Sequence, residues 1–226
     1  MLFFGGGTGS VPLLPYIDYE SIRKHPKLFV SYSDGTSILN AIYFQTGMET
    51  YYGQMPGLFE NISEADYFQF SSHFVENSAD CLQGNGKWKT ICGGTAEGIL
   101  VGGYLGNVAL EIGSQYFDLK REEKYLLFLE DHERFSSVAE VDMYLSHIEQ
   151  NEGMKNVSGL LFGCYSSREY SAESPLHQLF ELLERFGKRN GIPVAYCDEF
   201  GHGEKHAILP IGRRVVLDAD GQVLQF

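Results

Sequence analysis

Closely spaced cysteines, basic clusters and long apolar runs are all missing from this sequence of 226 residues. The four cysteines are far apart and form no CxxC pattern, which predicts reduced, mostly buried thiols in a cytoplasm. These cysteines are Cys81, Cys92, Cys164 and Cys197. A disulfide framework is therefore not expected.

The charge balance and the hydropathy pattern exclude two classes of partner. Lys and Arg number 17 against 30 Asp and Glu, so the formal net charge is -13 and the isoelectric point is about 4.9. Nucleic acids and anionic membrane surfaces require clustered basic residues, so we expect neither as a partner. No apolar run approaches the ~20 residues that span a bilayer, and residues 1–4 lack a basic flank before three glycines. We therefore expect a soluble, unexported, cytoplasmic protein.

Strand and helix signals alternate in the first part of the chain. Residues 27–33 predict a strand, and residues 34–46 predict a helix with a 3.6-residue apolar period that Gly47 ends. This order is typical of βαβ units and implies a parallel sheet. Upstream we expect a strand at 2–4, a loop at 5–9 and a helical turn at 12–16.

A polar stretch divides the chain into two predicted domains. Asn61-Ile-Ser-Glu64 is typical of a capping box that opens a helix toward Val75, and residues 76–87 have the composition of a linker. The predicted boundaries are 1–75 for the N-terminal domain, 76–87 for the linker and 88–226 for the C-terminal domain. The predicted fold class is α/β, with an incomplete parallel Rossmann-like sheet first and a mixed α/β domain second.

The C-terminal domain contains further strand and helix signals. Strands are expected at 88–92, 99–101, 125–130, 157–164 and 192–196. Helices are expected near 137–150 and 175–189, and residues 213–226 predict a hairpin that turns at Asp220-Gly221.

The segment 28–36 contains the most informative candidate site. A short apolar strand turns there into a helix, and Ser33 stands at the corner beside the helix N-terminus. That geometry exposes the hydroxyl as in a nucleophile elbow, although the G-x-S-x-G pattern would require glycine at Ser31. As the alternative, Ser33 or Asp34 could serve only as a helix N-cap.

Two other segments could complete acyl-transfer chemistry. Glu130 ends the apolar strand at 125–130, and His202 lies between two glycines on a loop. A serine, an acid and a histidine at the ends of different elements make acyl transfer the first hypothesis. The alternatives are a solvated strand-end charge for Glu130 and a tight turn at His202.

The Gly-rich stretch 5–10 has two interpretations. After a strand it could bind phosphate, with Asp34 as the ribose-binding acid of a dinucleotide fold. The spacing misses GxGxxG, however, and no Lys follows as a P-loop requires. The same backbone amides could instead bind an oxyanion.

The segment His202-Gly-Glu204-Lys-His206 resembles a metal cluster but lacks the order of HExxH. Gly203 and Pro210 oppose a helix that would align the two imidazoles. We therefore expect no metal and no cofactor.

Several motifs together resemble one family of serine peptidases. They are a Gly-Gly loop, Leu14-Pro-Tyr-Ile-Asp-Tyr19, Pro26-Lys-Leu-Phe-Val-Ser-Tyr-Ser-Asp34, Gly102-Gly103, Leu127-Phe-Leu-Glu-Asp131, Gly201-His-Gly203 and Leu209-Pro-Ile-Gly212. In order and spacing over nearly the whole chain, they resemble the LD-carboxypeptidase family, which includes the microcin C self-immunity hydrolases.

The resemblance implies a Ser-Glu-His set made of Ser33, Glu130 and His202. It also implies two domains, with the nucleophile in the N-terminal sheet and the acid and base in the C-terminal domain. His202 would take the proton of Ser33 while Glu130 orients the imidazole.

The oxyanion would be held by the backbone N–H of Asp34 and an amide of the Gly6-Gly7 loop. By resemblance the substrate is a murein peptide, cut before a terminal D-alanine during cytoplasmic wall recycling. Three alternatives stay open: a same-family amidase acting on peptidyl- or aminoacyl-nucleotides, with Trp88 as a stacking surface; a non-catalytic member that only binds wall peptides; and a dinucleotide-binding protein. We expect a homodimer.

The chain departs from the family pattern in several places. Ser31 replaces a usual glycine, Gln54 a usual proline and Tyr104 a usual asparagine, and we expect the first to tighten the elbow and the last to alter the pocket. Family members also carry a strand and a helix before the Gly-Gly loop. We expect this chain to be less stable and less active than an extended version unless a partner covers the sheet edge.

Overall fold

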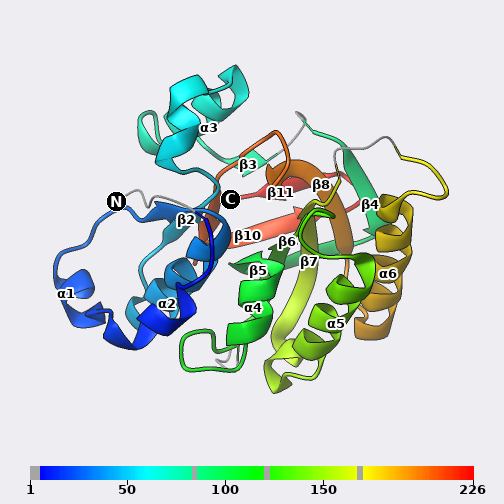
Figure 1. Cartoon of the computed structure of the whole chain (residues 1–226), viewed down its shortest axis with the longest axis horizontal. Helices are drawn as coiled ribbons and strands as arrows, with labels where there is room; N and C mark the ends of the chain where they lie inside the picture. Colours follow the sequence, from blue (N-terminus) through cyan, green and yellow to red (C-terminus); the bar gives the residue numbers. More distant parts are fainter. Residues whose placement is uncertain (1–5, 83–85, 120–122, 167–169) are drawn as a thin grey trace.

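Long apolar runs build a central parallel sheet. The strands β6 (Tyr125–Glu130) and β7 (Val157–Cys164) are buried almost throughout, as expected for strands that are covered on both faces. They lie between β5 (Thr95–Tyr104) and β8 (Val194–Gly201), and neighbouring strands in this set run parallel. The predicted α/β class with parallel strands is therefore confirmed (Figure 1).

The structure is a computed structural model that describes residues 6–82, 86–119, 123–166 and 170–226. Within these ranges the larger sheet has the strand order β3-β11-β10-β5-β6-β7-β8-β4. The added strands, all antiparallel to their neighbours, are β3 (Cys81–Leu82), β4 (Trp88–Cys92), β10 (Arg214–Asp218) and β11 (Val223–Gln225). The sheet is therefore mixed, and the predicted C-terminal hairpin is formed by β10 and β11.

A smaller sheet contains the first βαβ unit. β1 (Val30–Ser31) runs parallel to β2 (Thr50–Tyr52), and α2 (Thr36–Thr46) connects them before Gly47 caps the helix. A strand that was not predicted, β9 (Leu209–Ile211), pairs antiparallel with β2. The small sheet is therefore mixed as well, and residues on both sides of the predicted linker build it. The predicted strand at 2–4 lies outside the described residues.

One large hydrophobic cluster includes residues of both sheets and of the helices. β3 lies inside the predicted linker, and the division into two domains at 76–87 stays a prediction.

Three helices pack beside the parallel strands and next to one another in Figure 1: α4 (Leu105–Glu111), α5 (Val138–Glu149) and α6 (Pro175–Asn190). α5 begins at a complete capping box formed by Ser137 and Glu140, and α6 buries the predicted apolar stripe that includes Leu179, Leu183 and Phe186. The helix α4 was not predicted. In the part of the chain that the structure describes, no helix has both the length and the apolar composition needed to cross a membrane.

Apart from one turn between α5 and β7, the remaining described helices precede β3 in the chain. They are the short turns η1 (Val11–Tyr16), η2 (Ser33–Gly35), η3 (Pro56–Asn61) and η4 (Glu152–Asn156), with the helices α1 (Tyr19–Lys24) and α3 (Glu64–Phe74). The predicted capping box at Asn61 is wrong, because Asn61 ends η3 and Ser63 caps α3 by accepting a hydrogen bond from the Asp66 N–H. The helix itself ends next to Val75, as predicted.

Candidate active site

Ser33 stands at the turn between β1 and α2. Its φ is +58°, in the left-handed region that residues other than glycine rarely adopt, whereas Tyr32 before it is extended. Gly35 completes the turn because a Cβ there would lie 2.0 Å from Ser31 Oγ. A strained serine between a strand and a helix is the backbone arrangement of a nucleophile elbow.

The three side chains proposed from the sequence lie in hydrogen-bond contact. His202 Nε2 is 2.9 Å from Ser33 Oγ, and His202 Nδ1 is 2.8 Å from Glu130 Oε2. Glu130 is the last residue of β6, and His202 follows the last residue of β8. Because parallel strands end at the same edge of a sheet, two residues 72 positions apart meet there.

The Glu130 carboxylate is fully buried and accepts hydrogen bonds on both oxygens. Oε2 also accepts the backbone N–H of His202 at 3.2 Å, and Oε1 accepts the Tyr52 hydroxyl at 2.5 Å. Gly201, with φ +103°, permits the close approach, since a Cβ there would lie 2.9 Å from Oε2. These donors compensate for the desolvation of a buried carboxylate.

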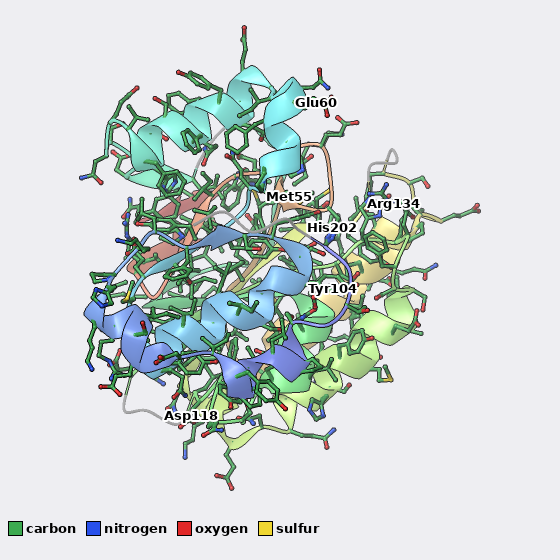
Figure 2. The ribbon with its side chains drawn as sticks, turned by 60° about the vertical axis from the view of Figure 1, so that its left-hand side comes forward. Met55, Glu60, Tyr104, Asp118, Arg134 and His202 are labelled. Carbon is green, nitrogen blue, oxygen red and sulfur yellow. The ribbon has the colours of Figure 1, made fainter. Side chains whose placement is uncertain are left out.

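Aromatic rings surround the His202 imidazole, which is 11% exposed. The ring centroids of Tyr32, Phe135 and Tyr104 lie 4.6, 4.9 and 5.2 Å from that of the imidazole. Arg134 Nη2 donates a hydrogen bond to the His202 carbonyl at 2.9 Å, and Figure 2 shows Tyr104, His202 and Arg134 near one another. Burial, together with the charge of Glu130, raises the pKa of Tyr32 well above its usual range, so this phenol is neutral.

The predicted oxyanion residues lie beside the elbow or on the loop that leads to it. The Asp34 carboxylate accepts the Ser10 N–H at 3.0 Å and the Ser10 hydroxyl at 2.9 Å, which ties the Gly-rich loop to the elbow. Gly6 and Gly7 precede Ser10 and have φ values of +65° and +108°. The role of Asp34, Gly6 and Gly7 in holding an oxyanion stays a prediction.

A buried polar network continues behind Asp34. Asn107 Nδ2, on α4, donates to Asp34 Oδ1 at 3.0 Å and to Ser37 Oγ at 2.7 Å. Burial raises the pKa of Glu111 to about 7; the nearby Ser37 hydroxyl opposes this shift, and the charge of Asp34 adds to it. The sequence contained no signal for this network, because Asn107 and Ser10 are far from Asp34 along the chain.

The two histidines of the predicted loop contact different carboxylates. His206 lies against Asp66 on α3, with Nδ1 3.3 Å from Oδ2 and its backbone N–H 2.9 Å from Oδ1, whereas His202 contacts Glu130. Burial raises the pKa of Asp66, but the hydrogen bonds with His206 outweigh burial and leave it below the usual value. Across the described ranges, no group of three or more His, Cys, Asp or Glu side chains is placed to hold a metal ion.

The three departures from the expected pattern have distinct surroundings. Ser31 packs against Gly35, and Tyr104 packs against His202. Gln54 donates from Nε2 to the carbonyls of Asp66 and His206, at 2.8 and 3.2 Å. Two of these positions therefore touch the candidate site or the elbow directly.

A cavity of about 450 Å³ is lined by residues of β4, α6, β8 and the loop after His202, and Ser33, Glu130 and His202 are not among the described residues that line it. Its wall includes Cys164, and a Cβ on Gly203, which follows His202, would lie 2.5 Å from Cys164 Sγ. Other wall residues include Lys87, Trp88, Lys89, Phe180 and Lys205. Burial raises the pKa of Cys164 to about 11, so this free thiol is protonated.

Known proteins resemble the chain in sequence and in structure. The family model of the LD-carboxypeptidase N-terminal domain matches residues 1–53, and the family model of the LD-carboxypeptidase C-terminal domain matches residues 97–217. The microcin C7 self-immunity protein MccF of Escherichia coli is 26% identical, over 96% of this chain and 70% of that protein. A probable murein peptide carboxypeptidase of Bacillus subtilis is 26% identical, over 94% of this chain and 66% of that protein.

Among solved structures, the crystal structure of an MccF-like protein from Bacillus anthracis has a TM-score of 0.84 and 26% identity. That match covers 100% of this chain and 75% of the other.

Proposed function

The chain belongs to the LD-carboxypeptidase family of peptidases, and on this premise we propose that it is a serine hydrolase with Ser33 as its nucleophile. The observation that carries the proposal is the continuous line of contacts from Ser33 Oγ through the His202 imidazole to Glu130, at 2.9 and 2.8 Å. A nucleophile in contact with a base that a third group orients is the arrangement needed for covalent catalysis.

In the proposed mechanism, Ser33 Oγ attacks the substrate carbonyl while His202 Nε2 accepts its proton. Glu130 keeps the proton on Nδ1 and stabilises the imidazolium. The negative charge on the carbonyl oxygen is held by the Asp34 N–H and an amide of Gly6 or Gly7. His202 then protonates the leaving amine, and a water molecule that His202 activates releases the acyl group from Ser33.

The substrate of the proposed reaction is a murein peptide, from which the enzyme releases a terminal D-alanine in the cytoplasm. The family and the relative named as a murein peptide carboxypeptidase support this choice. The cavity of about 450 Å³ is large enough for a peptide portion, and Lys87 and Lys89 on its wall would attract the carboxylates of such a peptide, whereas Lys205 there pairs with Asp198 at 3.6 Å.

One observation favours a second candidate, an amidase that acts on an aminoacyl- or peptidyl-nucleotide. Trp88 and Phe180 line the same cavity, and the indole N–H of Trp88 donates to Glu199 Oε1 at 2.8 Å, which fixes the ring. A fixed aromatic face can stack on a nucleobase. The relative named as a microcin C7 self-immunity protein is consistent with this alternative.

The experiment that tests the proposal supplies the protein with a defined murein tetrapeptide and, separately, with an aminoacyl adenylate analogue that has a cleavable amide. D-alanine release, measured by a coupled oxidase, supports the carboxypeptidase, whereas nucleotide release supports the amidase. The same peptide ending in L-alanine is the matched control and should stay intact. Binding of the peptide without release, and without labelling of Ser33 by a fluorophosphonate, would instead identify a non-catalytic binding protein.

A further inference from the structure

Tyr52 connects the proposed nucleophile to the proposed acid. It is the last residue of β2, in the small sheet, and it is fully buried. Its hydroxyl lies 2.5 Å from Glu130 Oε1 and 3.2 Å from the backbone nitrogen of Ser33. One oxygen atom therefore contacts both Ser33 and Glu130, the first and the last residue of the hydrogen-bonded series Ser33, His202 and Glu130.

The direction of both hydrogen bonds is determined by their partners. An ionised carboxylate only accepts and a backbone N–H only donates, so the phenol donates to Glu130 and accepts from Ser33. Leaving a buried N–H without a partner is unfavourable, so the Tyr52 oxygen helps to hold Ser33 in its left-handed conformation at φ +58°. The proton of the Tyr52 hydroxyl, donated to Oε1, fixes the rotation of the Glu130 carboxylate.

The surroundings of Tyr52 separate the role of its ring from that of its hydroxyl. The ring packs against Tyr32 and Phe128, with centroids 5.8 and 5.4 Å away, and a phenylalanine could make these contacts equally well. The titratable groups that face the hydroxyl are Glu130 and Tyr32. Those around His202, on which the pH test depends, are Glu130, Tyr32, Tyr104, Asp131, His132 and Arg134. Burial and the charge of Glu130 raise the pKa of Tyr52 well above its ordinary value, so the phenol keeps its proton.

We propose that Tyr52 is a positioning residue of this hydrolase, whose hydroxyl holds the Glu130 carboxylate and the Ser33 backbone in the relative placement that His202 requires. The inference rests on the proposed serine mechanism. It assigns a task in the reaction to the small sheet, which holds the nucleophile and the acid together through one side chain. The Tyr52 hydroxyl also takes up part of the negative charge of Glu130 and so limits how strongly Glu130 favours the imidazolium form of His202.

Tyr52→Phe tests the inference, with Tyr51→Phe as the matched control. Tyr51 is the preceding residue of the same strand, but its hydroxyl donates to Glu49, away from the candidate site. Loss of one preorganised donor lowers kcat roughly 10- to 100-fold in Tyr52→Phe, with little change in KM, while Tyr51→Phe stays within about twofold of the wild type. The rate of Ser33 labelling by a fluorophosphonate should fall in parallel with kcat.

The pH profile distinguishes positioning from a merely structural role. Without the phenol proton, more negative charge faces His202, the imidazole protonates more readily, and the acid limb of kcat/KM moves to higher pH. A 3-fluorotyrosine at position 52, which keeps the hydroxyl and donates more strongly, should move the limb to lower pH. Loss of stability alone would lower the unfolding midpoint without moving the limb.

The outcomes separate this inference from the function on which it rests. Suppose that the wild type is active and that folded Tyr52→Phe has the same kcat and an unmoved acid limb. This result overturns the role of Tyr52 but not the proposed function. If Tyr52→Phe does not fold, the fluorotyrosine protein decides, and an unmoved limb there overturns the inference. A wild type that neither turns over substrate nor labels at Ser33 overturns both proposals.

Discussion

The elbow that carries Ser33 and the strand ends that carry Glu130 and His202 are stabilised in different ways. Ser33 follows β1, a strand of two residues, and has a left-handed backbone that polar contacts from Tyr52 and around Asp34 support. Glu130 ends β6 and His202 follows β8, two long, buried parallel strands whose place is determined by apolar packing. Polar substitutions near the elbow should therefore impair the reaction first, whereas apolar substitutions in the parallel strands should impair folding first.

The largest expected effect is at the nucleophile. Ser33→Ala should lower turnover by about 10⁴-fold or more while the unfolding midpoint stays close to that of the wild type, since no packing is removed. His202→Ala should lose nearly as much, because members of such a set act as a unit. Steady-state turnover and thermal unfolding measure the two quantities.

Labelling sharpens this test of the elbow. A fluorophosphonate should modify Ser33, as located by peptide mass spectrometry, and the Ser33→Ala protein should not be modified. Labelling at another serine, or turnover by Ser33→Ala, would contradict the assignment of the nucleophile.

The second prediction concerns the parallel strands. Leu161, in β7, is fully buried, so Leu161→Ala should lower the free energy of unfolding by about 2–5 kcal/mol through lost burial and a cavity. The kcat of the folded fraction should change little. Urea unfolding measures the stability, with Leu110→Ala as the control because that leucine is 74% exposed. A stable Leu161→Ala protein with a strongly reduced kcat would break the contrast between the two regions.

The third prediction concerns the network behind the elbow. Asn107→Ala removes the amide that donates to Asp34 and Ser37, so kcat should fall about tenfold as the elbow and the Gly-rich loop lose a shared anchor. Asn190→Ala is the control, because Asn190 bonds to Glu149 and the Phe186 carbonyl instead. Equal kcat in both variants would show that the network serves folding alone.

The fourth prediction concerns pH and Glu111. Burial raises the folded-state pKa of Glu111 from 4.5 to about 7, so the folded protein retains a proton that the unfolded chain loses. The free energy of unfolding should therefore fall as the pH rises from 4.5 toward 7, and Glu111 should account for about 1–3 kcal/mol of that fall. Glu111→Gln should abolish this part of the loss.

Urea unfolding at several pH values measures the effect of Glu111. The variant should match the wild type near pH 4 and exceed it near pH 8. Glu60→Gln is the control, because Glu60 is exposed on η3 at the outer surface (Figure 2). Parallel pH curves for wild type and Glu111→Gln would contradict the prediction.

The smallest expected effect is that of metal removal. Activity should be unchanged after treatment with a chelator, because the proposed base is His202 and its imidazole contacts Ser33 and Glu130. Turnover before and after chelation measures this, with metal analysis of the purified protein. Activity that is lost and then restored by added zinc would favour a metal-bound water over the serine mechanism.

The elements that could be predicted from the sequence are those with a long local pattern. β6, β7 and α6 were predicted nearly to the residue, because apolar runs and a helical stripe repeat over many positions. The strand β9 was missed because it has three residues and pairs with a strand far away in sequence. The helix α4 was missed because it is short and follows directly after β5.

In the candidate site, too, the residues with a local pattern could be predicted and those that depend on distant contacts could not. Ser33, Glu130 and His202 could be proposed because each stands where a strand ends, and the resemblance connected them. Ser10 and Asn107 could not, since their importance depends on contacts with Asp34 that no local pattern records.

The sequence by itself determined the α/β class, the main parallel strands and the three proposed catalytic residues, because strand ends and helix starts are local properties of the chain. Only the tertiary structure decided which of two adjacent tyrosines reaches Glu130. Successive strand residues point to opposite faces, so this choice depends on how β2 is placed between β1 and β9. In that placement Tyr52 turns toward Phe128 and Glu130, and Tyr51 turns toward Phe74.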